Sequence, residues 1–467
     1  MEEKGLFDVI VIGSGPGGYV AAIRAAQLGA KVLLIEKDEL GGTCLNRGCI
    51  PTKTMLADAK FYDLVKQSSV LKTEGLRVDM KQLLLRKSEV VKKLGLGVQS
   101  LIKNNGIAFS QGMAKFLDRK TVEVEGKKGK EKFEARKIII ATGSVSTQIP
   151  NVPVDGKAIL TSTDILNLSS IPDSLLIIGG GFIGIEFACL FNGLGSKVTV
   201  IEMLPEIIST EDEEVIRGLT TLLKKRKIEI YTETKVKEAK VKKGQAEVTA
   251  INKERKEILF RAGKALVAVG RSPYTDGLQL EKINVVFDGK FIKVNEKMET
   301  NIPEIYAIGD VTGRQMLAHK ASTEGIVAAE NALGRQTKVD YSKIPNCIYT
   351  FPEVASLGLT ENQGRKNGLQ ITVGRFPFAS NGRALAEGGS DGFVKVIADK
   401  DLGQVIGVHI LGDHATDLIG GPVLAMALEA TIEEMGRTIQ AHPTLMEAVA
   451  EASLDAMKEA IHLPKKN

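Results

Sequence analysis

Two cysteines, Cys44 and Cys49, lie in the segment from Gly41 to Lys53 with four residues between them. A disulfide between them would close a ring of only six residues, and so short a loop gains little stability from loop closure. The pair is better explained as a bond that opens and closes than as a structural staple. Packing is the alternative interpretation, because cysteine is among the most buried residue types.

The surroundings of the pair favour redox chemistry. A helical pattern follows Pro51, and if that helix begins at Cys49, its positive end and the charge of Lys53 would lower the pKa of the Cys49 thiol. A zinc site would need about four ligands, whereas Cys189 and Cys347 stand alone far along the chain. We therefore expect a dithiol and no metal.

An internal repeat supplies the elements that must position this dithiol. Each unit is a strand, a glycine-rich loop, a helix, a second strand and a glutamate, and 23 positions separate the first glycine from the acid (13 to 36 and 179 to 202). The first unit comprises residues 8–12, 13–18, 19–29, 31–35 and Glu36, and the second comprises residues 175–178, 179–184, 185–195, 197–201 and Glu202. Two such units in one register indicate two dinucleotide sites.

The glycines have separate tasks in such a loop: the first permits the tight turn, the second admits the pyrophosphate and the third lets the helix pack on the strand. They are Gly13, Gly15 and Gly18 in the first loop and Gly179, Gly181 and Gly184 in the second. Glu36 and Glu202 can accept hydrogen bonds from ribose hydroxyls, and Glu202 would repel a 2′-phosphate, which favours NAD over NADP. Two dinucleotides and a dithiol predict an electron relay, with flavin at the first loop, beside the dithiol.

Three further predicted strands end in glycine-containing turns that could lie near the dinucleotide sites. A buried strand from 137 to 141 leads into Thr142 and Gly143, and a similar strand from 265 to 269 leads into Gly270. A third, from 305 to 308, ends at Gly309-Asp310 before a helix from about 319 to 333. Asp310 could bind the ribityl hydroxyls of FAD, which would return the chain to the first domain.

Composition sets the limits of the functional class. The chain has 467 residues, enough for two to four domains. A net charge of +5, 5% aromatic residues without tryptophan, and lysine runs (127–130 and 224–227) typical of a hairpin turn and a helix end do not predict nucleic-acid binding. Neither an apolar run of about 18 residues nor a targeting pattern at the N-terminus is present. Four cysteines without a disulfide framework suit a reducing cytoplasm.

Together these motifs resemble the pyridine nucleotide-disulfide oxidoreductases, and within them the enzymes that reoxidise protein-bound dihydrolipoamide with NAD+. The resemblance covers essentially the whole chain and rests on residues 41–53, both glycine loops, 307–310 and 442–447. It implies an α/β fold with two Rossmann-like domains, for FAD and NAD, and a C-terminal α+β dimerisation domain. The implied bounds are 1–147 for the first part of the FAD domain, 148–273 for the NAD domain, 274–343 for a central region that completes the FAD site and 344–467 for the interface domain.

The resemblance also implies roles for single residues. Cys44 would exchange with the lipoyl sulfur, and Cys49 would face the flavin. Lys53 and Glu186 would pair beside the flavin, and Phe182 would stand where nicotinamide enters, with packing as the alternative. FAD would contact Gly13, Gly15, Gly18, Glu36, Thr43, Lys53, Thr142, Gly143, Asp310 and Ala318, and NAD would contact Gly179, Gly181, Phe182, Gly184, Glu202 and Gly270.

Thiol–disulfide exchange also requires a base for the incoming thiol, and a histidine paired with a carboxylate suits that task. The resemblance assigns it to His442 with Glu447, and implies a cis bond before Pro443. The other four histidines are expected to be structural or peripheral: His319 as a helix cap or near FAD, His409 after a strand at 404–408, and His414 and His462 in a loop and the tail.

The resemblance implies a homodimer in which His442 reaches the partner's dithiol. It also implies a lipoylated partner, either the E2 domain of a 2-oxoacid dehydrogenase complex or the H protein of glycine cleavage. Two alternatives remain: a glutathione reductase-like enzyme, which should carry arginines near Glu202 for NADP, and a non-catalytic redox sensor, which would need no acid–base pair.

Overall fold

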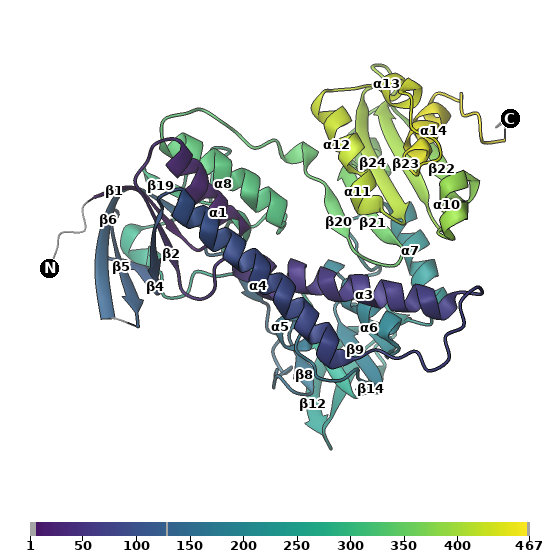
Figure 1. Ribbon diagram of the computed structural model, residues 1–467, viewed down its shortest axis with the longest axis horizontal. Helices are drawn as coiled ribbons and strands as arrows, with labels where there is room; N and C mark the ends of the chain where they lie inside the picture. Colours follow the sequence, from purple (N-terminus) through teal and green to yellow (C-terminus); the bar gives the residue numbers. More distant parts are fainter. Residues whose placement is uncertain (1–5, 128, 465–467) are drawn as a thin grey trace.

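The computed structural model describes residues 6–127 and 129–464. Residues 1–5, 128 and 465–467 lie outside these ranges. They include part of the N-terminal segment searched for a targeting pattern and Lys128 of the predicted lysine-rich turn. The described residues form three main sheets with flanking helices and three smaller sheets, and the C-terminal sheet stands apart from the N-terminal one (Figure 1). No helix in the described ranges is long and apolar enough to cross a membrane.

The first sheet has seven strands in the order β3-β2-β1-β6-β5-β4, with β19 paired to β6. Strands β1, β2 and β19 and the last three residues of β6 pair in parallel and are mostly apolar, as is usual for a sheet covered on both faces. The elements of this region are β1 (Phe7–Ile12), β2 (Val32–Glu36), β3 (Ala108–Gln111), β4 (Met113–Phe116), β5 (Thr121–Gly126), β6 (Gly129–Ile140), β19 (Ile305–Ala307), α1 (Pro16–Gln27) and α8 (Ala318–Ala332). The pairing of β19 with β6 returns the chain to the first sheet, as the Gly-Asp turn predicts.

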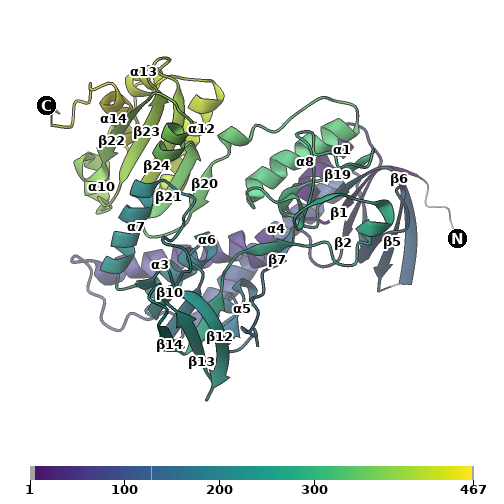
Figure 2. The same cartoon turned by 180° about the vertical axis from the view of Figure 1, so that it is seen from behind.

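Helices α1 and α8 lie side by side (Figures 1 and 2). A Cβ atom built on Gly325 would lie 2.4 Å from the carbonyl oxygen of Gly17, and one on Gly17 would lie 2.8 Å from that of Ala321. Because neither backbone could give way without moving its helix, only glycine fits at these two contacts. Helix α8 is thereby fixed against the helix that follows the first glycine loop.

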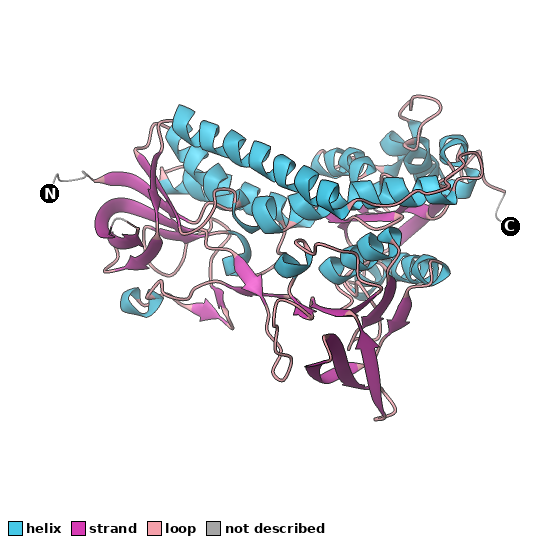
Figure 3. Cartoon of the chain, turned by 60° about the horizontal axis from the view of Figure 1, so that its bottom comes forward, coloured by secondary structure: helices cyan, strands magenta, loops and turns pink. Residues whose placement is uncertain are grey.

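Three helices follow β2 in the chain: the short α2 (Gly42–Arg47) and the long α3 (Cys49–Gln67) and α4 (Met80–Asn104). The two long helices pack against the core of the second sheet. Helix α3 buries Met55, Leu56 and Ala59 on one face, and Asp79 caps α4 by accepting from two backbone N–H groups. Figure 3 shows the long helices running along one side of the molecule, above the strands.

The second sheet has the order β11-β10-β9-β15-β8, and its paired strands are parallel. Between β11 and β15 the chain forms an antiparallel sheet, β12-β13-β14. Two further two-stranded sheets are β7-β16 and β17-β18. The bounds are β7 (Ser144–Ser146), β8 (Ile159–Leu160), β9 (Ser174–Ile178), β10 (Lys197–Ile201), β11 (Glu229–Tyr231), β12 (Lys235–Lys242), β13 (Gln245–Ile251), β14 (Glu257–Ala262), β15 (Lys264–Val267), β16 (Arg271–Pro273), β17 (Phe287–Asp288), β18 (Phe291–Ile292), α5 (Ser162–Ile165), α6 (Phe182–Leu194) and α7 (Glu213–Lys225).

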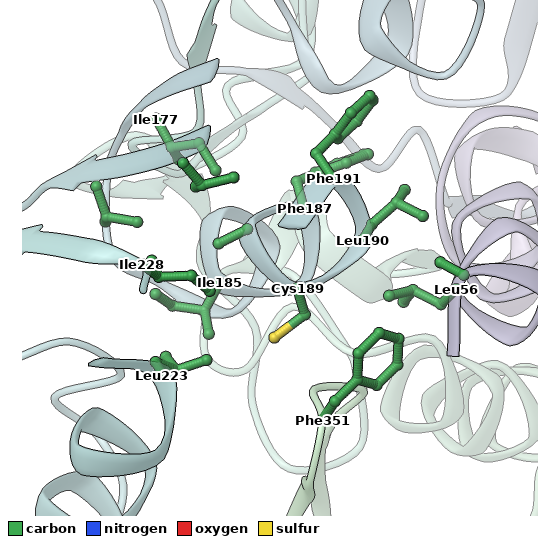
Figure 4. Packing of buried hydrophobic residues seen from close by; sticks show 14 of the residues in the cluster. Leu56, Ile177, Ile185, Phe187, Cys189, Leu190, Phe191, Leu223, Ile228 and Phe351 are labelled. Atoms are coloured by element: carbon green, nitrogen blue, oxygen red, sulfur yellow. The ribbon is translucent and has the colours of Figure 1, made fainter. Parts of the chain in front are cut away.

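Helix α6 is apolar around most of its circumference and forms the centre of the largest core. Figure 4 shows Cys189 of this helix packed near Leu56 of α3 and Phe351 of the C-terminal region. Burial raises the pKa of the Cys189 thiol to about 12. Cys189 therefore fills core space as an inert thiol.

The third sheet is antiparallel, in the order β20-β21-β24-β23-β22. Its elements are β20 (Asn346–Ile348), β21 (Glu353–Gly358), β22 (Ile371–Pro377), β23 (Phe393–Asp399), β24 (Val405–Gly412), α9 (Glu361–Lys366), α10 (Gly382–Glu387), α11 (Ala415–Leu418), α12 (Gly420–Ala427), α13 (Ile432–Arg437) and α14 (Glu447–Ala456). The expectation that His409 follows a strand is wrong. His409 lies inside β24, where its buried Nε2 is 2.9 Å from the backbone oxygen of Leu359, while Nδ1 has no hydrogen-bond partner among the described residues. The residue continues the strand and does not end it.

A buried ion network joins the third sheet to α7. The Nζ atom of Lys395 lies 2.9 Å from carboxylate oxygens of Asp212, Glu214 and Glu361, and the side chains of Lys395 and Asp212 are each 2% exposed. These contacts hold the C-terminal region against the region of the second sheet. The predicted α/β arrangement of two Rossmann-like domains and a C-terminal α+β domain is confirmed, while the proposed boundaries at 147, 273 and 343 remain predictions.

Candidate active site

Cys44 and Cys49 lie on two consecutive helices, the first of which begins beside the first glycine loop. Cys44 is in α2, and Cys49 is the first residue of α3, which meets the condition stated for the helix after Pro51. Gly42 has φ +60°, and a Cβ atom there would lie 2.6 Å from the Cα of Gly15. Glycine therefore allows the dithiol segment to approach the loop more closely than any other residue would. The short helix around Cys44 was not predicted.

Both cysteines are free in this structure. A hydrogen bond from the Cys44 thiol and the charge of Lys53 lower the pKa of Cys49, while burial and Glu186 raise it, and the net result is a pKa of about 7. The same hydrogen bond, together with burial, raises the pKa of Cys44. The pair is thus a thiol next to a thiolate, which is the reduced form of a reactive dithiol.

An ion pair next to the dithiol connects all three regions. The Nζ atom of Lys53, on α3, donates to both carboxylate oxygens of Glu186, on α6, at 2.8 and 2.7 Å. The backbone N–H of Tyr349 donates to the same carboxylate at 3.1 Å, and its ring centroid is 4.5 Å from Nζ. The structure therefore brings together Lys53 and Glu186, as expected, and adds Tyr349, which no sequence spacing indicates.

The first glycine loop has the features that a dinucleotide pyrophosphate needs. A Cβ atom on Gly15 would meet nothing within 4 Å, so there is open space beside the backbone. Helix α1 begins after Gly15 without a side-chain cap, which leaves its first N–H groups available to a phosphate. Glu36, at the end of β2, accepts from Ser14 N at 2.8 Å and from Ser14 Oγ at 2.7 Å. These residues fit the FAD predicted here.

Residues from three distant segments meet behind the predicted flavin site. The Oγ atom of Ser144 donates to Asp310 and accepts from Arg271 Nε at 2.7 Å, and Arg271 Nε is 3.9 Å from Asp310 Oδ2. Thr142 Oγ1 donates to the oxygen of Tyr274 at 2.6 Å. Ser144 and Arg271 were missed because 127 positions separate them in the sequence. Of the other predicted flavin contacts, Thr43 is in α2, Gly143 follows Thr142 with φ +70°, and Ala318 begins α8.

The second glycine loop repeats the geometry of the first. Glu202, at the end of β10, accepts from Gly180 N at 2.6 Å and from Leu204 N at 2.8 Å. A Cβ atom on Gly181 would again meet nothing within 4 Å, and α6 begins after it without a side-chain cap. These residues fit NAD. Phe182 is the half-buried first residue of α6, and Gly270 has φ +122° after β15.

His442 and Glu447 form the predicted pair in the C-terminal region. Nδ1 of His442 is 2.9 Å from Glu447 Oε1, and Thr444 N donates to Oε2 at 2.8 Å. The Thr444 N–H and then His442 lower the pKa of the Glu447 carboxyl, so Glu447 is an anion that orients the ring. The His442 side chain is 79% exposed, and its bond to Pro443 is cis, as predicted.

The single chain does not bring this pair to the dithiol. Helices α14 and α3 lie apart in both views of the chain (Figures 1 and 2). Within residues 6–127 and 129–464, no hydrogen bond or ion pair connects His442 or Glu447 with Cys44 or Cys49.

The remaining histidines take other roles. His319 is near the start of α8 as expected, but the expected cap is wrong: Nε2 is 2.8 Å from the oxygen of Pro345, and α8 has no side-chain cap. His414 precedes α11, and His462 in the tail pairs with Glu451 at 2.8 Å. Both positions agree with the prediction.

Comparison with known proteins gives the family. Residues 7–325 match the pyridine nucleotide-disulphide oxidoreductase family, and residues 344–453 match its dimerisation domain. The dihydrolipoyl dehydrogenase of Bacillus subtilis (strain 168) is 42% identical over 98% of this chain and 99% of its own length. That of Thermus scotoductus is 43% identical over 98% and 99%, and the mitochondrial dihydrolipoyl dehydrogenase 1 of Arabidopsis thaliana is 41% identical over 98% and 91%.

Solved structures agree with this match. The HOCl-induced flavoprotein disulfide reductase RclA from Escherichia coli superimposes with a TM-score of 0.87 at 27% identity, over 96% of this chain and 99% of that one. LpdA from Mycobacterium tuberculosis gives 0.89 at 25% identity over the same shares. The chain therefore belongs to the pyridine nucleotide-disulphide oxidoreductases, a family that uses FAD and NAD, and it carries that family's dimerisation domain, which supports a homodimer.

Proposed function

We propose that the protein is a dihydrolipoyl dehydrogenase, which oxidises dihydrolipoamide to lipoamide and transfers the two electrons to NAD+. The observation that carries the proposal is the placement of Cys44 and Cys49, on two consecutive helices, against the first of two glycine loops. The dihydrolipoyl dehydrogenases to which the chain is 41–43% identical support the choice of substrate.

The exchange begins with the oxidised pair. One thiolate of dihydrolipoamide attacks Cys44, the Cys44–Cys49 bond breaks, and Cys49 leaves as a thiolate. The second lipoyl thiolate then attacks the lipoyl sulfur held by Cys44, so that the lipoamide disulfide forms and Cys44 is released. The depressed pKa of Cys49 makes it the better leaving group. The two electrons of the substrate now reside in the reduced pair.

Two protons must leave the substrate during this exchange. We assign their removal to His442, held by Glu447 with its Nε2 edge exposed. Because the pair is remote from the dithiol of its own chain, it would serve the dithiol of the second subunit. The dimerisation domain at residues 344–453, which includes His442 and Glu447, supports that arrangement.

FAD, when bound, supplies the acceptor for the electrons of the dithiol, and NAD+ carries them away as hydride. The proposed flavin ligands are the loop Gly13–Gly18, Glu36, Thr43, Lys53, Thr142, Gly143, Asp310 and Ala318, and the proposed NAD ligands are the loop Gly179–Gly184 with Phe182, Glu202 and Gly270. The carboxylate of Glu202 favours a free ribose hydroxyl over a phosphate. Lys53, neutralised by Glu186, would lie next to the flavin and Cys49.

We propose further that the physiological substrate is a lipoylated protein, either the E2 domain of a 2-oxoacid dehydrogenase complex or the glycine-cleavage H protein. The dihydrolipoyl dehydrogenases to which the chain is 41–43% identical support a lipoyl substrate. The cysteine usage supports a cytoplasmic location.

Steady-state turnover tests the proposal. Purified holoenzyme is assayed with dihydrolipoamide and NAD+ or NADP+, and in reverse with glutathione disulfide and NADPH. We expect turnover with dihydrolipoamide and NAD+, its loss in Cys44→Ser, and its retention in the control Cys347→Ser, a half-buried thiol outside the pair. Faster reduction of glutathione disulfide by NADPH would indicate a glutathione reductase-like enzyme. Retained activity in Cys44→Ser, or bound FAD without any turnover, would contradict the proposal and favour a redox sensor.

A further inference from the structure

A charged pair lies fully buried behind the turn that carries Asp310. Lys320 and Glu324 are one helical turn apart on α8, their Nζ and Oε2 atoms are 3.1 Å apart, and both side chains are 0% exposed. Burying two charges is costly, and replacing such a pair by apolar residues is often neutral or stabilising. Stability alone therefore does not explain the pair.

The pair makes hydrogen bonds to both ends of the turn from Gly309 to Gly313. Glu324 Oε2 accepts from the backbone N–H of Gly309 at 2.7 Å. Lys320 Nζ donates to the carbonyl oxygens of Gly309 and Gly313, each at 3.3 Å. Tyr341 completes the network by donating to Glu324 Oε1 at 2.7 Å. Every charged oxygen thus has a partner, which makes the network rigid.

The turn itself needs such support. Gly309 and Gly313 have φ of +75° and +77°, a region that glycine visits but does not prefer over other conformations. Without fixed partners, a chain with two glycines at its ends would sample many shapes, and ordering it would reduce the affinity of any ligand that requires one of them. Asp310, which follows Gly309, would share this disorder.

Helix α8 also holds the other side of the site. Its Gly325 lies against Gly17 of α1, so closely that no Cβ fits between them. The same helix therefore fixes the first glycine loop through α1 and the 309–313 turn through its charged pair. Helix α8 therefore fixes the distance between the loop that would contact the pyrophosphate and the turn that would contact the ribityl chain.

We propose that Lys320 and Glu324 are positioning residues that hold the 309–313 turn in its binding shape before FAD arrives, so that Asp310 is presented without an ordering cost. This inference rests on the proposed placement of FAD at Asp310. The pair touches the turn and not the reacting atoms, so its effect is on flavin affinity.

The first test compares matched double variants. Lys320→Met/Glu324→Gln removes both charges together, and Lys395→Met/Asp212→Asn neutralises the two most buried members of the Lys395 network, whose side chains are 2% exposed. FAD affinity is measured by flavin fluorescence after reconstitution of the apoprotein, with circular dichroism as the check of folding. We expect the first variant to bind FAD about tenfold more weakly or worse, a change of about 1.4 kcal/mol, and the control to keep wild-type affinity. Wild-type affinity in the first variant, or an equal loss in both, would overturn the proposal.

The second test needs no variant, and so decides the matter if the double variant does not fold. Hydrogen exchange is followed in the peptide covering residues 305–317 of wild-type apoprotein and holoprotein. Protection of the turn in the apoprotein, close to that in the holoprotein, is expected. A turn that exchanges like an open loop until FAD binds would contradict pre-organisation.

A third variant separates this inference from the assignment beneath it. If Asp310→Ala weakens FAD binding but Lys320→Met/Glu324→Gln does not, the positioning role is wrong and the placement of FAD stands. If Asp310→Ala has no effect, FAD does not use this turn, and both claims fall.

Discussion

In both nucleotide-binding units, the glutamate at the end of the second strand accepts a hydrogen bond from its own glycine loop: Glu36 from Ser14 N at 2.8 Å, and Glu202 from Gly180 N at 2.6 Å. The two units differ in what surrounds this shared geometry. Glu36 is buried and Glu202 is half-buried, while Gly15 is half-buried and the equivalent Gly181 is exposed.

The difference comes from segments outside the repeat. The dithiol helix approaches the first loop through Gly42, and α8 packs on α1 behind it. A repeated unit thus provides nucleotide recognition twice, and the added segments enclose only one copy. Enclosure slows dissociation, whereas an open site allows exchange. We therefore expect the first loop to retain its FAD through many turnovers and the second to exchange NAD in each one.

The largest effect is expected from equivalent glycines of the two loops. A Cβ atom on Gly18 would lie 1.9 Å from the oxygen of Gly13, and one on Gly184 would lie 2.0 Å from that of Gly179, so alanine must displace either loop. Gly18→Ala should lose FAD affinity by about a hundredfold or more and purify without flavin absorbance. Gly184→Ala should keep its flavin and raise KM for NAD+ by a similar factor. Loss of flavin from both variants would break the distinction between the loops.

A smaller effect should separate the two glutamates. Glu202→Gln removes a charged acceptor and the repulsion of a 2′-phosphate, so KM for NAD+ should rise about tenfold and preference over NADP+ should fall, in line with about 1.4 kcal/mol. Glu36→Gln should instead increase FAD dissociation and leave KM for NAD+ unchanged. Steady-state kinetics gives KM for NAD+ and NADP+, and FAD titration gives the dissociation of the flavin. An altered coenzyme preference in Glu36→Gln would contradict the assignment of the loops.

The smallest expected change concerns the contact between the regions, where Lys53 meets Glu186. The depressed pKa of Cys49 means that its thiolate predominates above about pH 7 and is protonated below it. Lys53→Met removes a nearby positive charge, so the pKa should rise to about 8 or above. Lys60→Met is the matched control, because Lys60 is also on α3 and pairs with Asp413 at 2.7 Å. Thiolate absorbance of the reduced protein against pH gives the result; equal curves for both variants would show that Lys53 does not act on Cys49.

Much of both units could be predicted from the sequence because the information is local. The loop, the helix, the second strand and the acid follow one another within 23 positions of the first glycine, and each obeys its own pattern of apolar spacing and glycine placement. The helix that begins at Cys49 and the pairing of His442 with Glu447 are also short-range features. The structure confirms these elements at nearly the predicted bounds.

The segments that distinguish the units could not be predicted, because they depend on contacts across the fold. A lysine and a glutamate four positions apart usually form an exposed pair on a helix, so Lys320 and Glu324 gave no sign of burial. Ser144 and Asp310 are 166 positions apart. The apolar run at 404–408 predicts a strand that ends before the polar His409, because the buried acceptor on Leu359 lies 50 positions away and leaves no local pattern in the sequence.

The most direct test of the relay follows the thiols themselves. Oxidised holoenzyme is mixed anaerobically with one equivalent of dihydrolipoamide without NAD+, alkylated, and mapped by mass spectrometry. We predict new alkylation at Cys44 and Cys49, its disappearance when NAD+ is added before the alkylating agent, and its persistence after NAD+ in Gly184→Ala. If dihydrolipoamide leaves Cys44 and Cys49 unlabelled, although the same enzyme converts NAD+ to NADH with this substrate, the account is contradicted.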